Sequence, residues 1–201
     1  MTRLKHRFVL LALIAVYGQA AGCGSSPAVK YYALNPQVTA GSAATNLAIK
    51  VGPAQFPASL DRNQIVTRLS DTQVAVNQYN VWSAPLREQF LRVLGDNLGN
   101  ALGTDRVVVY PNDAGYSLDY QLLLDVLQFD GKIGGDVTLR VRWTLAAPDG
   151  SALESGLFSD SQAAGDAGYD GLVAAHNLLV ASLARSLASH LENLSSAARL
   201  G

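Results

Sequence analysis

The sequence predicts an α+β fold: a single two-layer domain in which a mostly antiparallel sheet packs against two helices. Three observations carry this prediction. Residues 136–147 alternate between apolar and polar side chains, two other stretches repeat leucine at helical spacing, and an apolar leader precedes the first strand. Apolar residues make up 49% of the 201-residue chain, which is ample for a packed core.

Short apolar runs bounded by Pro, Gly, Ser and Asn indicate strands in the first half of the domain. They cover residues 29–34, 47–52, 64–69 and 72–79. We expect Gly52-Pro53 to end the second run. Ser70-Asp71 separates the third run from the fourth and predicts a hairpin there.

A helix is expected next, because apolar residues recur at every fourth position. This apolar stripe consists of Leu86, Phe90, Leu94, Leu98 and Leu102. Pro85 is expected in the first turn, where its missing N–H costs nothing, and Gly103 should end the helix. Gly95 and Gly99 either weaken this helix or allow another element to approach it closely.

The second half of the domain is expected to form four strands and a long helix. The strands cover residues 106–110, 117–130, 136–147 and 151–162, with turns at 131–135 and 148–150. In the third of them one face carries Val137, Leu139, Val141, Trp143 and Leu145. These runs predict an antiparallel meander with one buried face, followed by a helix from about Tyr169 to Arg199.

Residues 1–22 have the pattern of a secretory signal peptide. Arg3, Lys5 and Arg7 form a basic start, and residues 8–22 form an apolar run. That run is shorter than the roughly 20 residues that a permanent membrane-spanning helix needs. Cys23, the single cysteine of the chain, follows directly.

This junction resembles the bacterial lipobox, where a signal peptidase cuts before a cysteine whose thiol carries diacylglycerol. Ala20, Ala21 and Gly22 are small enough for such a peptidase, although Ala20 stands where the lipobox usually has Leu. The resemblance implies lipidation of Cys23 and, because Gly24 is not Asp, export to the outer membrane. The alternatives are a cleaved signal followed by a free cysteine, and an ordinary N-terminal helix.

The expected organisation is therefore a cleaved signal peptide at 1–22, a lipidated cysteine and tether at 23–28, and one domain at 29–201. The five tether residues after the cysteine reach at most about 17 Å, so the domain should sit close to its membrane.

Charge and cysteine content exclude several classes of site. The chain has 15 Lys and Arg against 16 Asp and Glu, and three of the basic residues lie in 1–22, which holds no acidic residue. Residues 23–201 therefore carry 12 basic against 16 acidic residues, a net charge of −4. Such a chain is a poor nucleic-acid binder. A lone cysteine also excludes an internal disulfide and a cysteine-based metal site.

The sequence offers no catalytic or cofactor-binding set, and we predict no enzyme activity. His176 and His190 are fourteen residues apart on the last helix, about 21 Å at 1.5 Å per residue, so they cannot share a metal. A histidine on a helical stripe is more often a packing residue. Asp119 and Asp125 lie six residues apart on one strand, which a solvated face explains better than a paired-carboxylate site.

Two short stretches are candidates for a partner interface. Their residues are Asp61, Arg62, Arg68, Tyr79, Trp82 and Pro85. Trp, Tyr and Arg concentrate at binding hot spots, which favours an interface. The structural alternative is that Asp61 and Arg62 pair locally and that Trp82 packs over the start of the helix.

Several stretches resemble the PqiC/YmbA family of ABC-transport auxiliary lipoproteins. They are KYYAL, IKVGPAQFPASLDRNQIVTR, YNVWSAPLREQFLRVLGDNLGNAL, VVVYP, DYQLLLDVLQFDG, VTLRVRWTL and YDGLVAAHNLLVASLARSLASHL. The likeness runs from about Lys30 to Leu191, with one departure at Val81, where the family often has Arg.

The resemblance implies a role in moving lipid across the periplasm. Family members accompany MCE-domain proteins, which form hydrophobic conduits between the two membranes, and the lipoprotein would dock the conduit at the outer membrane without hydrolysing anything. A ringed conduit also suggests a homo-oligomer. Two alternatives stay open: a lipoprotein that assists outer-membrane protein or lipopolysaccharide assembly, and a periplasmic ligand-binding or hydrolytic domain, which would need a deep polar pocket.

Overall fold

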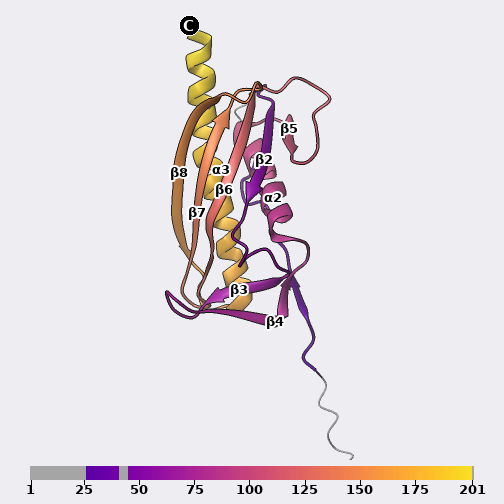
Figure 1. Ribbon diagram of the computed structural model, residues 1–201, viewed down its shortest axis with the longest axis vertical. Coiled ribbons are helices and arrows are strands. Elements are labelled where there is room, and N and C mark those ends of the chain that lie inside the picture. The colour runs from indigo at the N-terminus through magenta and orange to yellow at the C-terminus, as the bar shows by residue number, and fades with distance from the viewer. Residues whose placement is uncertain (1–25, 41–44, 201) are drawn as a thin grey trace, which may run out of the picture.

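The computed structural model describes residues 26–40 and 45–200. Cys23 and the expected signal peptide lie outside the described residues. The described chain forms an α+β domain in which one curled sheet wraps two helices (Figure 1). In chain order the elements are β1 (Lys30–Tyr32), β2 (Ile49–Gln55), β3 (Gln64–Arg68), β4 (Val74–Trp82), α2 (Leu86–Leu102), β5 (Val107–Val109), β6 (Tyr120–Gly131), β7 (Asp136–Ala146), β8 (Ala152–Ala163) and α3 (Gly168–Leu200).

The sheet is mixed, so the expectation of a mostly antiparallel sheet is wrong. Among the described strands, four of the seven pairs are parallel: β1–β4, β2–β5, β2–β6 and β3–β6. The antiparallel pairs are β3–β4, β6–β7 and β7–β8. The reason is the crossover through α2, which returns the chain so that β5 runs alongside β2 in the same direction.

β2 differs from its expected end, because it continues through Gly52-Pro53 to Gln55. Its pairing with β6 shifts register between Val51 and Ala54. The proline falls within this irregularity, where the ladder needs no N–H donor, so it interrupts the pairing without ending the strand.

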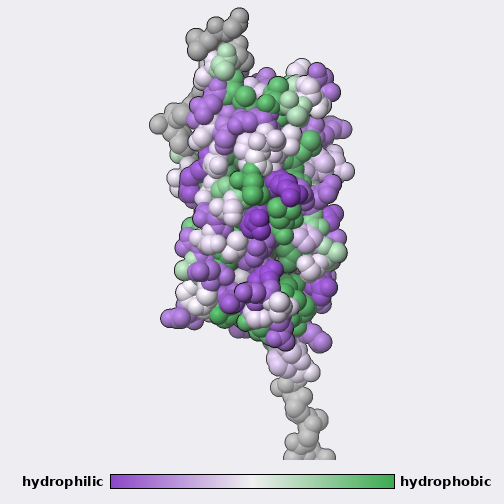
Figure 2. Space-filling model, turned by 60° about the vertical axis from the view of Figure 1, so that its left-hand side comes forward, coloured by the Kyte–Doolittle hydropathy of each residue, from purple (hydrophilic) through white to green (hydrophobic). Residues whose placement is uncertain are grey.

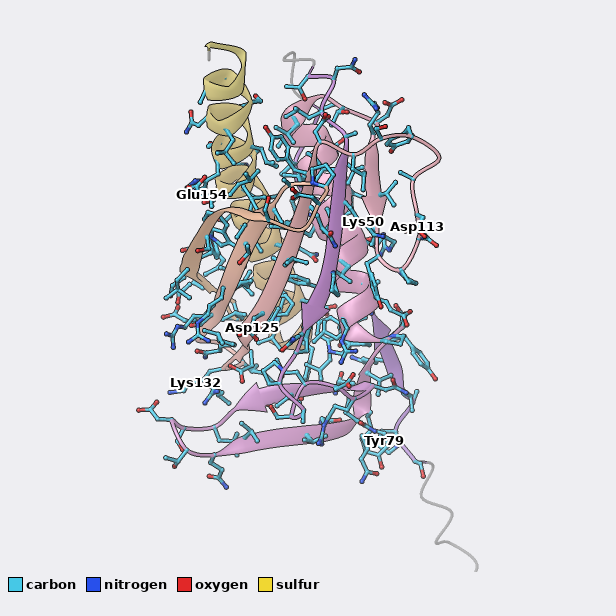
Figure 3. The ribbon with its side chains drawn as sticks, turned by 45° about the horizontal axis from the view of Figure 1, so that its top comes forward. Lys50, Tyr79, Asp113, Asp125, Lys132 and Glu154 are labelled. Atoms are coloured by element: carbon cyan, nitrogen blue, oxygen red, sulfur yellow. The ribbon has the colours of Figure 1, made fainter. Side chains whose placement is uncertain are left out.

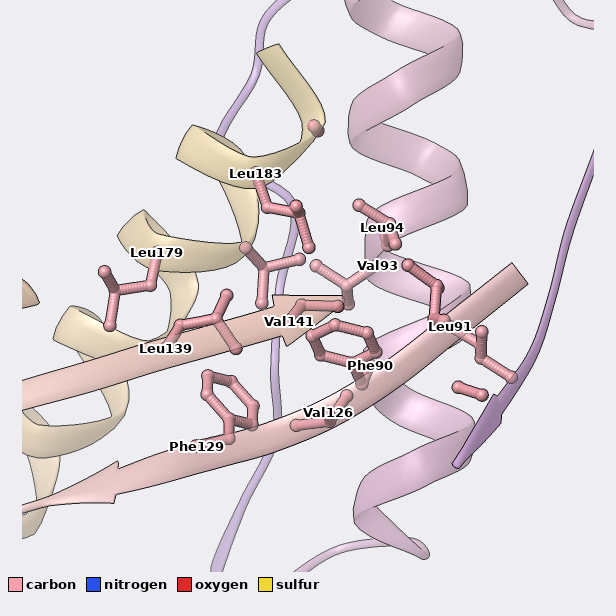
Figure 4. Close-up of a cluster of buried hydrophobic side chains, with 14 of the residues drawn as sticks. Phe90, Leu91, Val93, Leu94, Val126, Phe129, Leu139, Val141, Leu179 and Leu183 are labelled. Carbon is pink, nitrogen blue, oxygen red and sulfur yellow. The ribbon is translucent and has the colours of Figure 1, made fainter. Parts of the chain in front are cut away.

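The predicted meander and hairpin are confirmed. β6, β7 and β8 are consecutive antiparallel strands, and β3 and β4 form a hairpin across the turn at residues 69–73. The five expected apolar side chains of β7 are all buried. They face both helices: Figure 4 shows Leu139 and Val141 between Leu179 and Leu183 of α3 and Phe90 of α2.

The α2 helix ends at Gly103 as predicted, but it begins after Pro85, which was expected in its first turn. Pro85 is its N-cap residue, and Gly103 closes it in the left-handed conformation at φ 63°. The two internal glycines serve close packing. A Cβ on Gly95 would lie 2.8 Å from Val109 Cγ2, and one on Gly99 would lie 2.9 Å from the Thr104 carbonyl oxygen.

The α3 helix is long and apolar enough to cross a membrane by composition alone, but it is built into the domain. In its most apolar window 67% of the residues are buried. It packs against both α2 and the meander, and its last turns extend beyond the sheet (Figure 1). A core helix explains its composition.

Candidate partner interface

One end of the molecule brings together the start of the described chain and the β3–β4 hairpin. β1 lies parallel to β4, with Lys30 opposite Asn80 and Tyr32 opposite Trp82. The turn between β6 and β7 reaches the same hairpin, where Gly131 pairs with Thr67. This region comprises residues 26–32, the β3–β4 hairpin and the turn at residues 131–135. We call it the hairpin end (Figure 1).

An open hollow of about 420 Å³ lies at the hairpin end. Its lining residues are Pro27, Ala28, Lys30, Tyr32, Asn77, Tyr79, Asn80, Ala167, Gly168, Tyr169 and Asp170. This lining holds no His, Cys or Ser. It combines tyrosine rings with the amides of Asn77 and Asn80 and the charges of Lys30 and Asp170.

Tyr32 and Tyr169, the two half-buried tyrosines of the hollow, are held in place by hydrogen bonds. The Tyr32 hydroxyl donates to Asn80 Oδ1 at 3.1 Å, and the Tyr169 hydroxyl bonds with Thr67 and Asn77. Burial raises the pKa of both phenols, with the charge of Asp170 adding to the shift at Tyr32. Both therefore stay neutral, and they hold the N-terminal segment, the hairpin and α3 together.

Arg68, one of the predicted interface residues, holds the hairpin to the sheet. Its Nε donates to Asp130 Oδ1 at 2.7 Å, and Gln128 donates to the same oxygen at 3.0 Å. The Asp130 side chain is only 7% exposed. This hydrogen bond raises the pKa of the Arg68 guanidinium. Arg68 also donates from Nη1 to the Asp71 carbonyl oxygen at 3.3 Å, so its guanidinium is bonded within the domain at two positions.

Trp82 is buried, in line with the structural alternative for this residue. Its backbone N–H donates to the Asn63 carbonyl at 2.7 Å, and its ring meets His176 edge-on at 5.7 Å between centroids. It lies at the end of β4, which runs three residues further than expected.

Four of the predicted interface residues lie at the surface. Asp61 accepts a hydrogen bond from Arg87 at 3.0 Å, which links the loop before β3 to the first turn of α2 beside Pro85. Arg62 is exposed next to Asp61. Tyr79 lies apart from this group, on the hairpin beside the N-terminal segment (Figure 3). The structure therefore divides the predicted interface into two places.

The two histidines of α3 have separate packing roles. His176 is 1% exposed, its Nδ1 lies 2.7 Å from the Leu172 carbonyl oxygen, and its ring stacks edge-on against Phe129. Burial lowers its pKa, so the ring is neutral. His190 Nδ1 lies 2.7 Å from Glu154 Oε1. Within residues 26–40 and 45–200, no three His, Cys, Asp or Glu side chains are grouped as metal ligands would be.

Sequence reasoning missed the buried amides that hold the loop after β1. Gln89 accepts from the Leu34 N–H at 2.9 Å, and Asn177 accepts from the Asn35 N–H at 3.0 Å. Asn97 accepts from two successive N–H groups at 2.8 Å. The available signal was the presence of single polar residues beside the apolar stripes of the helices. Sequence reasoning also missed the tyrosine pair of the hollow, because its members are 137 positions apart in the chain.

Comparison with solved structures supports the fold. An uncharacterised protein aligns with a TM-score of 0.67 at 24% identity, covering 82% of this chain and 99% of its own. A protein from Xanthomonas campestris aligns with a TM-score of 0.71 at 15% identity, covering 86% and 100%. A PelC dodecamer from Paraburkholderia phytofirmans is more distant, with a TM-score of 0.42 at 12% identity, covering 73% and 90%.

Comparison with protein families shows the family to which the chain belongs. No curated protein matches it. Residues 32–188, which run from β1 into α3, match the family described as the ABC-type transport auxiliary lipoprotein component. This span includes α2, the part of α3 up to Ala188, and all the strands except the start of β1. The chain therefore belongs to the family of ABC-type transport auxiliary lipoprotein components.

Proposed function

We propose that this protein is the non-catalytic outer-membrane subunit of an MCE-type intermembrane lipid transport system, where it docks the periplasmic conduit. The observation that carries the proposal is the family match over residues 32–188, which makes the chain an auxiliary lipoprotein of an ABC-type transport system. As a lipoprotein it is anchored to a membrane of the cell envelope. The MCE partner and the outer-membrane location are the proposed refinements.

The proposed anchor is diacylglycerol on Cys23. The single cysteine stands directly after an apolar leader with small residues at 20–22, which supports cleavage before it and acylation of its thiol. Two or three acyl chains hold a protein in a bilayer almost permanently. Gly24 in place of Asp supports sorting to the outer membrane.

The proposed docking surface is the group formed by Asp61, Arg62 and Pro85 at the start of α2. These residues are exposed, and the Asp61–Arg87 pair links the loop of Asp61 and Arg62 to the start of α2, where Pro85 lies. Arg62 stands out because arginine often forms hot spots in interfaces. Arg68 and Trp82 are not part of this surface, since both are engaged inside the domain.

Affinity purification tests this function. The tagged full-length protein is recovered from detergent-solubilised envelopes, and co-purifying proteins are identified by mass spectrometry. An MCE-domain protein is the expected partner, and Arg62→Ala should reduce its recovery. Arg140→Ala, which removes an exposed arginine from β7, is the matched control and should leave recovery unchanged. Recovery of outer-membrane assembly factors without any MCE protein would overturn the proposal in favour of an assembly role.

A homo-oligomeric collar around the conduit is the second part of the proposal. β8 supports it, because among the described strands β8 pairs only with β7 and so leaves a sheet edge. On the side that carries β8, hydrophobic residues run in a narrow lengthwise band between hydrophilic ones (Figure 2). Light scattering of the solubilised lipoprotein should give the mass of a closed ring. A clean monomer at high concentration would contradict the collar.

A further inference from the structure

Exposed hydrophobic side chains gather at the hairpin end. The described residues include twelve large hydrophobic side chains that are exposed, and seven of them lie there, with exposed fractions from 38% to 71%. These seven are Val29, Tyr31, Leu69, Val74, Val76, Tyr79 and Ile133. Single exposed apolar residues are normal on any protein, but a group on one end indicates a contact surface.

Strand pairing brings the three segments that carry these side chains together. β1, which carries Tyr31, pairs with β4, and Thr67 of the hairpin pairs with Gly131 just before the turn that holds Ile133. Figure 3 shows Tyr79 and Lys132 at this same end of the molecule. The seven side chains thus belong to one surface, although the chain positions range from 29 to 133.

Backbone hydrogen bonds fix the turn between β3 and β4, which carries two of the exposed apolar residues. The N–H groups of Leu69 and Ser70 both donate to the Gln73 carbonyl, at 2.9 and 3.2 Å. Leu69 and Val74 flank this turn, and the Leu69 side chain is 57% exposed. The turn therefore projects them outward from the domain, where they add nothing to its core.

The proposed lipid anchor on Cys23 places a membrane near this surface. Cys23 is three residues before Ser26, the first described residue, and a chain spans at most about 3.6 Å per residue. An acylated Cys23 is therefore within about 11 Å of Ser26. Ser26 leads directly into β1, so the bilayer that holds the anchor must lie close to the hairpin end.

We propose that the hairpin end lies against the bilayer and inserts its apolar side chains into the headgroup region, an inference that rests on the proposed acylation of Cys23. Leu69, Val74 and Ile133 would enter the boundary with the acyl chains, and Tyr31 and Tyr79 would lie at the level of the headgroups, which is where tyrosine is enriched. The domain then stands upright, with the C-terminal end of α3 pointing away from the membrane (Figure 1).

The contact is apolar rather than electrostatic. The exposed charges at this end are mixed, with Lys30 and Lys132 offset by Asp71 and Asp136. A surface of this kind has no preference for anionic lipid. The contact should therefore persist in neutral vesicles and at high salt, which screens exposed charges.

Spin labelling of the acylated protein tests the contact. Because Cys23 is blocked by its acyl group, a cysteine introduced by Leu69→Cys or Val74→Cys is the single free thiol for a nitroxide. The lipoprotein is reconstituted into phosphatidylethanolamine–phosphatidylglycerol vesicles, and the label is exposed to oxygen or to a water-soluble nickel chelate. Leu153→Cys is the control, since Leu153 is an exposed leucine, the second residue of strand β8, at the other end of the sheet.

The expected result is that both hairpin labels become accessible to oxygen and shielded from nickel, while the Leu153→Cys label remains in water. Hairpin labels as open to nickel as the control would overturn the proposal. Labels shielded from both reagents would also overturn it, because they would indicate a protein contact instead. Mass spectrometry of the same sample reads out Cys23 directly. An unmodified thiol refutes the anchor and this inference together, whereas water-exposed labels on an acylated protein refute only the membrane contact.

Discussion

The buried ring of His176 makes the stability of this domain depend on pH. Burial lowers its pKa, so the folded protein resists the proton that the unfolded chain accepts below about pH 6.5. The unfolded state then binds more protons, and the free energy of unfolding must fall as the pH drops below that value.

We therefore predict a lower urea midpoint at about pH 5.5 than at pH 7.5, a window above the titration of most carboxylates. His176→Gln should flatten this pH dependence. An NMR titration checks the same point without substitution: the ring signals of His176 should shift only below the pH at which a free histidine titrates. An unchanged pH dependence in His176→Gln would contradict this role.

The Arg68–Asp130 pair gives a second prediction for single residues. Arg68→Met keeps an unbranched side chain as far as the position of Nε, but it removes the guanidinium and leaves the buried Asp130 carboxylate with Gln128 as its remaining side-chain donor. The loss should be about 2 kcal/mol of unfolding free energy, typical of a hydrogen bond to a charged group. Arg62→Met, at an exposed position, should change stability by less than about 0.5 kcal/mol. If urea unfolding gave the same loss of unfolding free energy for Arg68→Met and Arg62→Met, the Arg68–Asp130 pair would not hold the hairpin.

In the α2 helix, the two internal glycines differ in which atoms an added Cβ would contact. A Cβ on Gly99 would meet the backbone oxygen of Thr104, which cannot move without disturbing the helix end, whereas a Cβ on Gly95 would meet a methyl group of Val109. Gly99→Ala should destabilise the domain by roughly 1–3 kcal/mol despite the better helix propensity of alanine. Gly95→Ala should lower the free energy of unfolding by less, because a side-chain methyl group can move more easily than a backbone oxygen. Thermal unfolding compares the two variants, and a more stable Gly99→Ala would contradict the packing argument.

Most elements were predictable because their signals are local. The alternation of residues 136–147 and the leucine stripe of α2 depend only on side-chain spacing, and both elements form where expected. Strand neighbours depend on how the chain crosses over, which spacing does not reveal, so the parallel pairs of β2 were missed. Gly52-Pro53 looked like a strand end because the register shift that accommodates the proline needs the partner strand β6.

The candidate interface was harder to predict for a similar reason. Residue type indicates what a side chain can bind, but not whether the fold already uses it. Arg68 and Trp82 have partners from β6 and α3 that lie far from them in the sequence. Asp61, Arg62 and Pro85 were assigned from the same pattern and lie at the surface.

At the scale of the whole molecule, we propose a lipoprotein that is held by its acyl anchor and stands on its hairpin end. Because both proposed contacts with the bilayer are apolar, washing envelopes with high salt should leave the protein in the membrane fraction, whereas a detergent should release it. Immunoblots of the washed fractions check this. Release by salt alone would indicate that the protein is held by charge, which the mixed surface at the hairpin end cannot explain.

The central claim is that Cys23 becomes the acylated first residue of the mature protein. Intact-mass and N-terminal peptide analysis of the native protein, purified from envelopes, tests this most directly. We predict a mature chain that begins at Cys23 and carries diacylglycerol on the thiol, with all of residues 1–22 removed. A native chain that retains those residues, or that has an unmodified thiol at position 23, would contradict it.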